Sequence, residues 1–193
     1  MNETSKCHDS RRARGHFDRY LSGRGIDVGA GSDVLKAPDA QVRAWDLPDG
    51  DAQVLATVAD GQLDFLYSSH CLEHVRCVPT ALTNWTRVVR PGGHLYVVVP
   101  DYELYEKMKW PSLFNNDHKQ TFSTRITRAM PQRENHWHID QDLRPLFIER
   151  GVELLECEIE DAGFDYNNGP ADQTRGAALA QILLIARKRP VAQ

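Results

Sequence analysis

The first feature that could do chemistry is a pair of glycines that follows a short apolar stretch and has an acidic residue beside it. Ile26 and Val28 are typical of a buried strand, and Gly29 and Gly31 follow them at once. A strand that runs into such a turn is how open α/β sheets form a nucleotide pocket at the carboxyl ends of their strands. Asp27 could accept hydrogen bonds from a cationic or hydroxylated ligand, but it would repel a pyrophosphate. The pattern therefore predicts a pocket for a positively charged nucleoside rather than for a dinucleotide.

A second aspartate stands at a distance that suits a nucleoside. Asp46 closes a predicted strand over residues 42–46, and it lies 19 positions after Asp27. A carboxylate in this place can accept hydrogen bonds from two vicinal hydroxyl groups, so Asp46 is predicted to bind ribose. The alternative is that Asp46 belongs only to the turn that begins at Leu47 and Pro48.

Histidines supply the candidate acid–base chemistry. His118 could take a proton from a hydroxyl or ammonium group, and Asp117 or Asp101 could orient its ring. The alternative for His118 is a loop-capping role. His136 and His138 could chelate a metal ion, but no third ligand stands at a recognisable spacing, so we predict no metal site.

The hydrophobic pattern predicts the elements that position these residues. We expect strands over residues 26–28, 42–46, 63–69, 95–99, 152–159 and 180–187, and helices over residues 10–22, 33–36, 79–89 and 139–150. The basic first helix is either a lid over the ligand or a solvated helix at the sheet edge. Residues 100–133 are rich in polar and aromatic side chains and follow a strand end, which suits the wall of a substrate pocket.

Several motifs, in order, resemble the class I S-adenosylmethionine-dependent methyltransferases, and in particular their common small-molecule, type 11-like subgroup. They are the acidic residue with Gly-x-Gly at 27–31, the aspartate at 46, Ser-x-x-x-Leu-Glu-His at 68–74, Pro-Gly-Gly at 91–93 and Asn-x-Asp-His-x-x-x-Phe at 115–122. The resemblance is close over about residues 24–101 and looser beyond them. The third glycine position of the family's first motif holds Asp33 here.

The resemblance implies the fold and the domain organisation. The expected architecture is α/β and Rossmann-like: a seven-stranded, mostly parallel sheet in the order 3-2-1-4-5-7-6, with the last strand antiparallel and helices on both faces. Residues 1–193 are expected to form a single methyltransferase domain, with an N-terminal helical extension over residues 1–23 and a substrate-side insertion over residues 100–137.

The resemblance also implies a reaction and its residues. A methyl group would pass from S-adenosyl-L-methionine to an oxygen or nitrogen atom of a small-molecule or glycan-type acceptor, while the protein mainly aligns the two reactants. The expected cofactor-binding residues are Asp27, Gly29, Ala30, Gly31, Asp46, Leu47, Asp51, Ala52, Ser69 and His70. The expected substrate-binding residues are Asp101, Tyr102, His74 and Asp117, and His118 is the expected catalytic base.

Composition narrows the partners and the location. The chain has 23 Lys and Arg against 27 Asp and Glu, which gives a formal charge of −4. Because such a chain has no overall positive field to attract a phosphate backbone, we expect no nucleic-acid partner. None of the four cysteines forms a Cys-x-x-Cys pair, which favours free thiols in a reducing cytosol. Neither a membrane span nor a signal peptide is predicted, because no apolar run is long enough. The expected protein is cytoplasmic and could form a homodimer.

Two other functions stay open at this point. A cofactor-binding protein without catalysis could serve as a partner subunit, because donor binding and chemistry are separate properties. An NAD-dependent oxidoreductase needs a third glycine and usually an apolar residue where Asp27 stands, so the sequence disfavours it.

Overall fold

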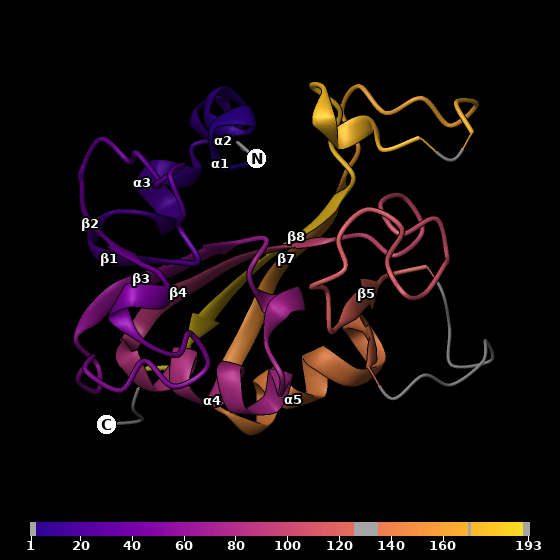
Figure 1. Ribbon diagram of the computed structural model, residues 1–193. Coiled ribbons are helices and arrows are strands. Elements are labelled where there is room, and N and C mark those ends of the chain that lie inside the picture. Colours follow the sequence, from indigo (N-terminus) through magenta and orange to yellow (C-terminus); the bar gives the residue numbers. More distant parts are fainter. Residues whose placement is uncertain (1–2, 126–134, 170, 191–193) are drawn as a thin grey trace.

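A six-stranded, mostly parallel β-sheet forms the centre of the molecule (Figure 1). The structure, a computed structural model, describes residues 3–125, 135–169 and 171–190. The strands follow the order β2-β1-β3-β4-β8-β7. Their bounds are β1 Gly23–Val28, β2 Ala40–Trp45, β3 Leu63–Ser69, β4 Val89–Pro100, β7 Val152–Glu160 and β8 Gln181–Lys188. The first four strands run parallel and β8 runs antiparallel to both of its neighbours, which confirms the α/β class and the antiparallel last strand.

The prediction of seven strands is wrong for the described residues, because the outermost strand of the expected order is missing. The segment between the short helix η1 (Leu47–Asp49) and β3 forms turns instead. The Arg87 guanidinium donates hydrogen bonds to the carbonyl oxygens of Val54 (3.1 Å), Leu55 (3.2 Å) and Val58 (2.9 Å). Backbone groups that an edge strand would offer to β2 are therefore already engaged, and the remaining order corresponds to 2-1-4-5-7-6.

Helices cover both faces of the sheet (Figure 1). One face carries α1 (Glu3–Lys6), α2 (His8–Ala13) and α3 (His16–Tyr20), and the other carries α4 (Val78–Val88) and α5 (Arg144–Glu149). Alternate residues of β3 serve the two layers, as strand geometry requires. Phe65 and Tyr67 belong to a core cluster with Phe17, whereas Leu66 belongs to a cluster with Trp85.

Three predicted helices differ in detail. The helix expected over residues 10–22 is divided into α2 and α3 at Gly15, whose φ of +67° does not continue a helix. The helix expected over residues 33–36 does not form, because the Leu35 amide donates to the Asp27 carboxylate (2.7 Å) instead of to a helical carbonyl. The helix expected over residues 139–150 begins as the π-helical turn η3 (Ile139–Leu143) and continues as α5.

The region predicted as a substrate-side insertion consists mainly of turns and a small second sheet. Strands β5 (Thr121–Ser123) and β6 (His136–His138) pair in parallel, and Asp101 forms a bridge with Phe122. Residues 126–134 of the predicted insertion lie outside the described residues. The connection between β7 and β8 contains the short helix η4 (Gln173–Arg175). Within the described part of the chain, no helix combines the length and the apolar character needed to cross a membrane.

Candidate functional site

The glycine turn after β1 is fixed by close packing and by backbone hydrogen bonds. Gly29 has a φ of +78°, and a Cβ atom there would lie 2.5 Å from the Cβ of Cys71, so no larger residue fits without a shift. The Gly29 amide donates to the Trp45 carbonyl (2.9 Å), which ties the turn to the end of β2. Gly31 also has a positive φ, and its amide donates to Oδ2 of Asp46 (2.7 Å). The two sequence features that suggested a nucleoside pocket are therefore in direct contact.

An outer cavity of about 720 Å³ lies beside this contact. Its lining includes four of the predicted cofactor residues after β2, namely Asp46, Leu47, Asp51 and Ala52. Asp46 starts the helix η1, and its Oδ1 accepts a hydrogen bond from the Leu47 amide (2.7 Å). Each Asp46 oxygen thus has one backbone donor and retains lone-pair capacity for a ligand.

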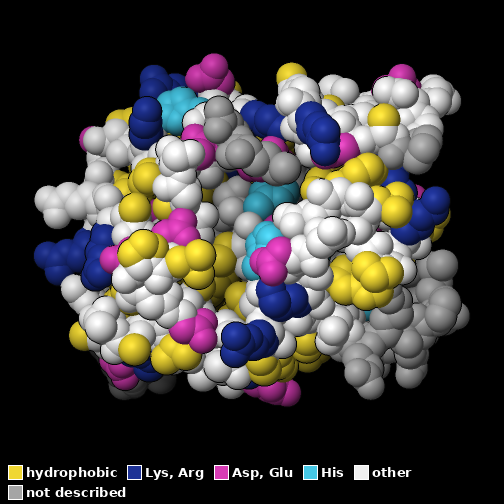
Figure 2. All heavy atoms as spheres, in the orientation of Figure 1, with side chains coloured by type: hydrophobic (Ala, Val, Ile, Leu, Met, Phe, Trp, Pro, Cys, Tyr) yellow, Lys and Arg dark blue, Asp and Glu magenta, His cyan; other side chains and the backbone are white. Residues whose placement is uncertain are grey.

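An inner cavity of about 310 Å³ continues the first one. Its walls come from the glycine turn and residues Ser32 and Asp33, from Ser69 and His70, from Glu73 and His74 of η2 (Leu72–His74), from Tyr105, Asn115 and His118, and from Glu3 and Thr4 of α1. Gly29, His70 and His74 line both cavities, so the two form one cleft along the carboxyl ends of the strands. Histidine side chains gather in a hollow at the centre of this face in Figure 2.

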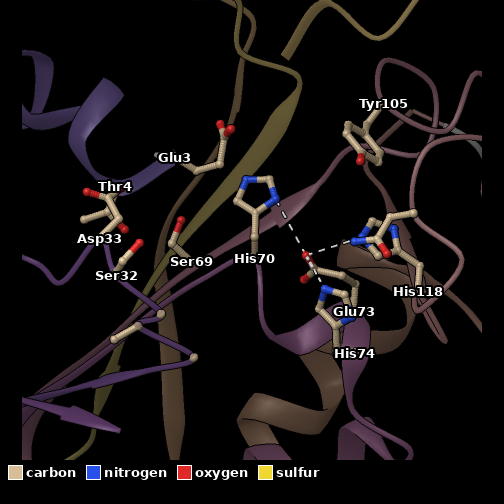
Figure 3. Close-up of a pocket in the computed structure, with 14 residues that line it drawn as sticks. Glu3, Thr4, Ser32, Asp33, Ser69, His70, Glu73, His74, Tyr105 and His118 are labelled. Atoms are coloured by element: carbon tan, nitrogen blue, oxygen red, sulfur yellow. Dashed lines mark ion pairs between the residues drawn. The ribbon is translucent and has the colours of Figure 1, made fainter. Parts of the chain in front are cut away.

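A buried carboxylate surrounded by imidazoles occupies one end of the inner cavity (Figure 3). Glu73 is 1 % exposed, and neither of its carboxylate oxygens has a hydrogen-bond partner among the residues that the structure describes. Its Oε1 lies 3.6 Å from Nδ1 of His70, 3.8 Å from Nε2 of His74 and 3.9 Å from Nε2 of His118. The three rings point toward the carboxylate but remain too far away for hydrogen bonds.

Each ring also contacts an acceptor on its other side. Nδ1 of His118 lies 2.6 Å from Oε1 of the buried Glu106, and Nδ1 of His74 lies 2.8 Å from Oδ2 of Asp117. Nε2 of His70 lies 2.9 Å from Oε1 of Gln181. Because carboxylates accept, these contacts hold the proton of His118 and of His74 on Nδ1. The Nε2 lone pairs of both rings then face Glu73.

Backbone hydrogen bonds hold Glu73 and the surrounding histidines in place. The amides of Lys119 and Gln120 both donate to the Glu73 carbonyl, at 2.8 and 3.0 Å, so the loop that carries His118 is tied to η2. His70 itself has a φ of +55°, in the left-handed region, and its amide donates to the Val98 carbonyl (2.9 Å). Backbone strain of this kind at a cavity wall is typical of functional sites.

The charge of the cavity walls is negative. The lining residues that the structure describes for the inner cavity include Glu3, Asp33 and Glu73, with no lysine or arginine among them. Burial raises the pKa of the Tyr105 hydroxyl above its usual range, so this side chain lines the cavity as a neutral phenol. At the rim, the hydrogen bond from Lys119, followed by that from His74, lowers the pKa of Asp117. The inner cavity therefore favours a cationic ligand, whereas the outer cavity has Arg76 and Lys119 among its lining residues beside its aspartates.

The predicted residues divide between the cleft and its support. Asp27 is buried and is not among the residues that line either cavity. Its carboxylate accepts a hydrogen bond from the Leu35 amide, and burial raises its pKa to about 7. Asp101 and Tyr102 do not line the two cavities either. Oδ1 of Asp101 accepts from the amides of Glu103 (2.9 Å) and Leu104 (2.8 Å), which shapes the turn that leads to Glu106.

The other histidine pair lies in local hydrogen bonds. Nδ1 of His136 lies 2.8 Å from the Thr121 hydroxyl, and Nε2 lies 2.9 Å from that of Ser123. Nδ1 of His138 accepts from the Gln141 amide (3.2 Å) and begins η3. Sequence reasoning missed Glu106 as well as Glu3 and Thr4 of the cavity wall. Their positions follow from the folding of loops and of the N-terminal helices, which no local pattern encodes.

Comparison with known proteins places the chain in a family. The methyltransferase domain family matches residues 13–135, and the chain belongs to it. This class I fold uses S-adenosyl-L-methionine, which is the cofactor of the protein. No curated protein sequence matches the chain.

Solved structures show the same fold at low sequence identity. A chain of the complex that contains the Haloferax volcanii Trm112 methyltransferase activator aligns with a TM-score of 0.58 and 15 % identity, covering 97 % of this chain and 94 % of that one. An S-adenosylmethionine-dependent methyltransferase from Mesorhizobium loti aligns with a TM-score of 0.55 and 14 % identity, covering 97 % and 100 %. The YcgJ protein of Bacillus subtilis aligns with a TM-score of 0.56 and 11 % identity, covering 93 % and 98 %.

Proposed function

We propose that this protein transfers a methyl group from S-adenosyl-L-methionine to an oxygen or nitrogen atom of a small-molecule or glycan-type acceptor. The observation that carries the proposal is the junction of two cavities at Gly29, His70 and His74. One cavity has the acids suited to a nucleoside, and the other has the imidazoles suited to proton transfer. An acceptor in the inner cavity would therefore meet both the donor and a proton-accepting group.

The outer cavity and the glycine turn fit the cofactor. The backbone from Gly29 to Gly31 lies open to the inner cavity, and Gly29 admits no side chain. We assign the methionine part of the cofactor to this turn together with Ser69 and His70. The ribose is assigned to Asp46, and the adenine to Leu47, Asp51 and Ala52. When bound, S-adenosylmethionine supplies a methyl group that is electrophilic because it is carried on a positively charged sulfur. The negative walls of the inner cavity suit that charge.

Asp27 is assigned an indirect part in cofactor binding. Its carboxylate holds the segment after the glycine turn through the Leu35 amide, and it is buried and does not line either cavity. It would attract the ammonium end of the cofactor through the field of its ionised form.

The chain's own part in the reaction is alignment and proton transfer. We assign proton removal from the acceptor to Nε2 of His118, whose Nδ1–H bond to Glu106 stabilises the imidazolium that forms. His74 lines both cavities, and its bond partner Asp117 lines the outer one; both are assigned to acceptor binding. Asp101 and Tyr102 would support the loop that forms the wall. Buried side chains around the reacting atoms keep the two reactants aligned.

Calorimetry and a turnover assay test the proposal. Asp46→Ala is expected to weaken cofactor binding by roughly 1–3 kcal/mol, because ribose hydroxyls lose their acceptor. His118→Ala is expected to leave cofactor affinity unchanged and to reduce the formation of S-adenosylhomocysteine with a panel of hydroxyl and amine acceptors. The exposed Asp18→Ala, on α3, is the matched control and should change neither quantity.

The two measurements separate the remaining functions. Cofactor binding without turnover on any acceptor of the panel would identify a binding protein without catalysis and would overturn the proposed function. Binding of NAD in place of S-adenosylmethionine would overturn the assignment of the cleft.

A further inference from the structure

We propose that Glu73, His74 and His118 bind a divalent transition-metal ion in the inner cavity. The three ligand atoms would be Oε1 of Glu73 and Nε2 of each histidine. One ligand atom from each residue lies within 4.8 Å of the other two. The ligands come from two separate segments, η2 and the loop before β5, and they converge in the fold (Figure 3).

The isolation of the Glu73 carboxylate is the first reason. It is buried, and within the described part of the chain neither oxygen has a hydrogen-bond donor and no lysine or arginine lines the cavity. An ionised carboxylate in this setting has lost its hydration without replacement, which is costly. A cation beside Oε1 supplies the missing partner.

The orientation of the two histidines is the second reason. Asp117 and Glu106 fix the protons of His74 and His118 on Nδ1, so Nε2 of each ring presents a lone pair toward Glu73. Three electron-rich atoms that face one another repel unless a positive ion lies between them. Histidine ligands in metal sites regularly have a carboxylate on the other ring nitrogen, because it fixes the tautomer and raises the basicity of the ligand.

The distances fit a small ion. Ligand atoms about 2.1 Å from a tetrahedral ion lie about 3.4 Å apart. Oε1 of Glu73 is 3.8 Å from Nε2 of His74 and 3.9 Å from Nε2 of His118, and the three ligand atoms lie within 4.8 Å of one another. Side-chain shifts of up to about 1.4 Å would therefore bring all three to this spacing. Two imidazoles and one carboxylate favour zinc, iron, cobalt or manganese over magnesium or calcium, and three protein ligands leave a position open to the cavity.

The open position assigns a substrate class, a step that rests on the proposed function. An acceptor hydroxyl bound to the ion has a lowered pKa and loses its proton to solvent in the cleft. Its oxygen then forms a bond to the methyl carbon while the carbon–sulfur bond breaks and leaves its electron pair on sulfur. The acceptor would therefore be an oxygen nucleophile. In this form of the reaction His118 is a ligand of the ion, and proton removal no longer depends on its Nε2.

Titration of the metal-free protein with Co²⁺ and Zn²⁺ tests the site directly. Wild-type protein, treated with a chelator and then freed of it, should bind one equivalent of Co²⁺ and develop the visible absorption of a tetrahedral or five-coordinate complex. Glu73→Gln and His74→Ala should each weaken binding by at least 100-fold. His94→Ala, which removes an imidazole of β4 outside the cavity lining, should bind as wild type does. Thermal unfolding without metal shows that each variant is folded.

The outcomes distinguish the site from the proposed function. Absence of Co²⁺ and Zn²⁺ binding by wild type, or equal binding by the variants, overturns the metal site and leaves the methyltransferase proposal in place. Metal binding without methyl transfer to any acceptor supports the site and overturns the proposed function. Methyl transfer at full rate in metal-free protein overturns the assignment of the ion to the reaction, and it returns proton removal to His118.

Discussion

Two buried charges in this chain have opposite surroundings. Arg11 of α2 and Glu73 of η2 are each 1 % exposed. The Arg11 guanidinium lies over the rings of Tyr67 (5.2 Å) and Tyr96 (5.5 Å), and its Nη1 donates to the Thr4 carbonyl (2.9 Å). Its Nε and Nη2 have no hydrogen-bond partner among the described residues, so the two aromatic faces supply most of its compensation. The carboxylate of Glu73 has no hydrogen-bond donor in residues 3–125, 135–169 and 171–190, and the ring nitrogens of three histidines lie 3.6–3.9 Å from its Oε1. Arg11 attaches the N-terminal helices to the sheet, whereas Glu73 is one of the ligands that we propose for a metal ion.

The difference separates a structural charge from a binding charge. Burial of a charge is tolerated when aromatic faces and a carbonyl compensate it, as around Arg11. A buried charge in a cavity wall that lacks such compensation lowers the stability of the protein. This loss of stability is typical of a site that binds a ligand. Substitutions at the buried residues Asp27, Arg11, Glu106 and Glu73 test this separation.

The largest effect concerns Asp27, which is buried with one donor and thus lies between the two cases. Burial raises its pKa from 3.8 to about 7, so the folded protein binds an extra proton between these values. The free energy of unfolding should therefore fall as the pH rises from 4 to 7, by about 4 kcal/mol from this group. Asp27→Asn keeps the acceptor for Leu35 and should remove this part of the slope.

Denaturant titrations of wild type and variant across pH 4–8 measure the effect. The two should have similar stability near pH 4, and the variant should be the more stable at pH 8. Asp18→Asn, at an exposed position of α3, should follow the wild-type curve. Parallel curves for wild type and Asp27→Asn would show that Asp27 stays ionised through the range and has compensation that the structure does not reveal.

Arg11→Met should lower the free energy of unfolding by about 3 kcal/mol, because two cation–π contacts and a charged hydrogen bond are lost. Arg12→Met, on the exposed side of the same helix, should change it by less than about 0.5 kcal/mol. Chemical denaturation measures both. Equal effects would mean that burial of Arg11 contributes nothing beyond its exposed neighbour.

Glu106→Gln should weaken binding of Co²⁺ by about 10- to 100-fold, which is typical when a carboxylate behind a histidine ligand is removed. Glu103→Gln, on the same loop but paired with Arg125, is the control and should bind normally. Calorimetric titration gives both affinities. An unchanged affinity in Glu106→Gln would mean that the tautomer of His118 is set by something else.

The smallest effect is a gain. Glu73→Gln should raise the free energy of unfolding of metal-free protein by about 1 kcal/mol, since an uncompensated charge leaves the interior. Glu153→Gln, on the exposed part of β7, should change it by less than about 0.5 kcal/mol. A loss of stability in Glu73→Gln would show that the carboxylate is compensated, and the contrast with Arg11 would disappear.

Local patterns predicted much of the fold and one side of the cleft. Strand residues, the glycine turn and the aspartate after β2 are signals contained in short stretches, and they correspond to β1, β2 and their contact at Gly31 and Asp46. The missing edge strand could not be predicted, because it depends on Arg87, which lies some 30 residues further along the chain. The inner cavity is similar in this respect. Its pairing of Glu106 with His118 joins two positions of the irregular connection between β4 and β5, and only the folded chain brings them together.

One backbone contact has a dynamic consequence. The Glu73 carbonyl accepts hydrogen bonds from the amides of both Lys119 and Gln120. The Glu73 carboxylate and the His118 ring therefore belong to one rigid unit. When thermal motion widens the cleft to admit an acceptor, this unit moves as a whole and the spacing between its two functional groups persists. Little entropy is then lost when a ligand arrives, because the ordering was completed during folding.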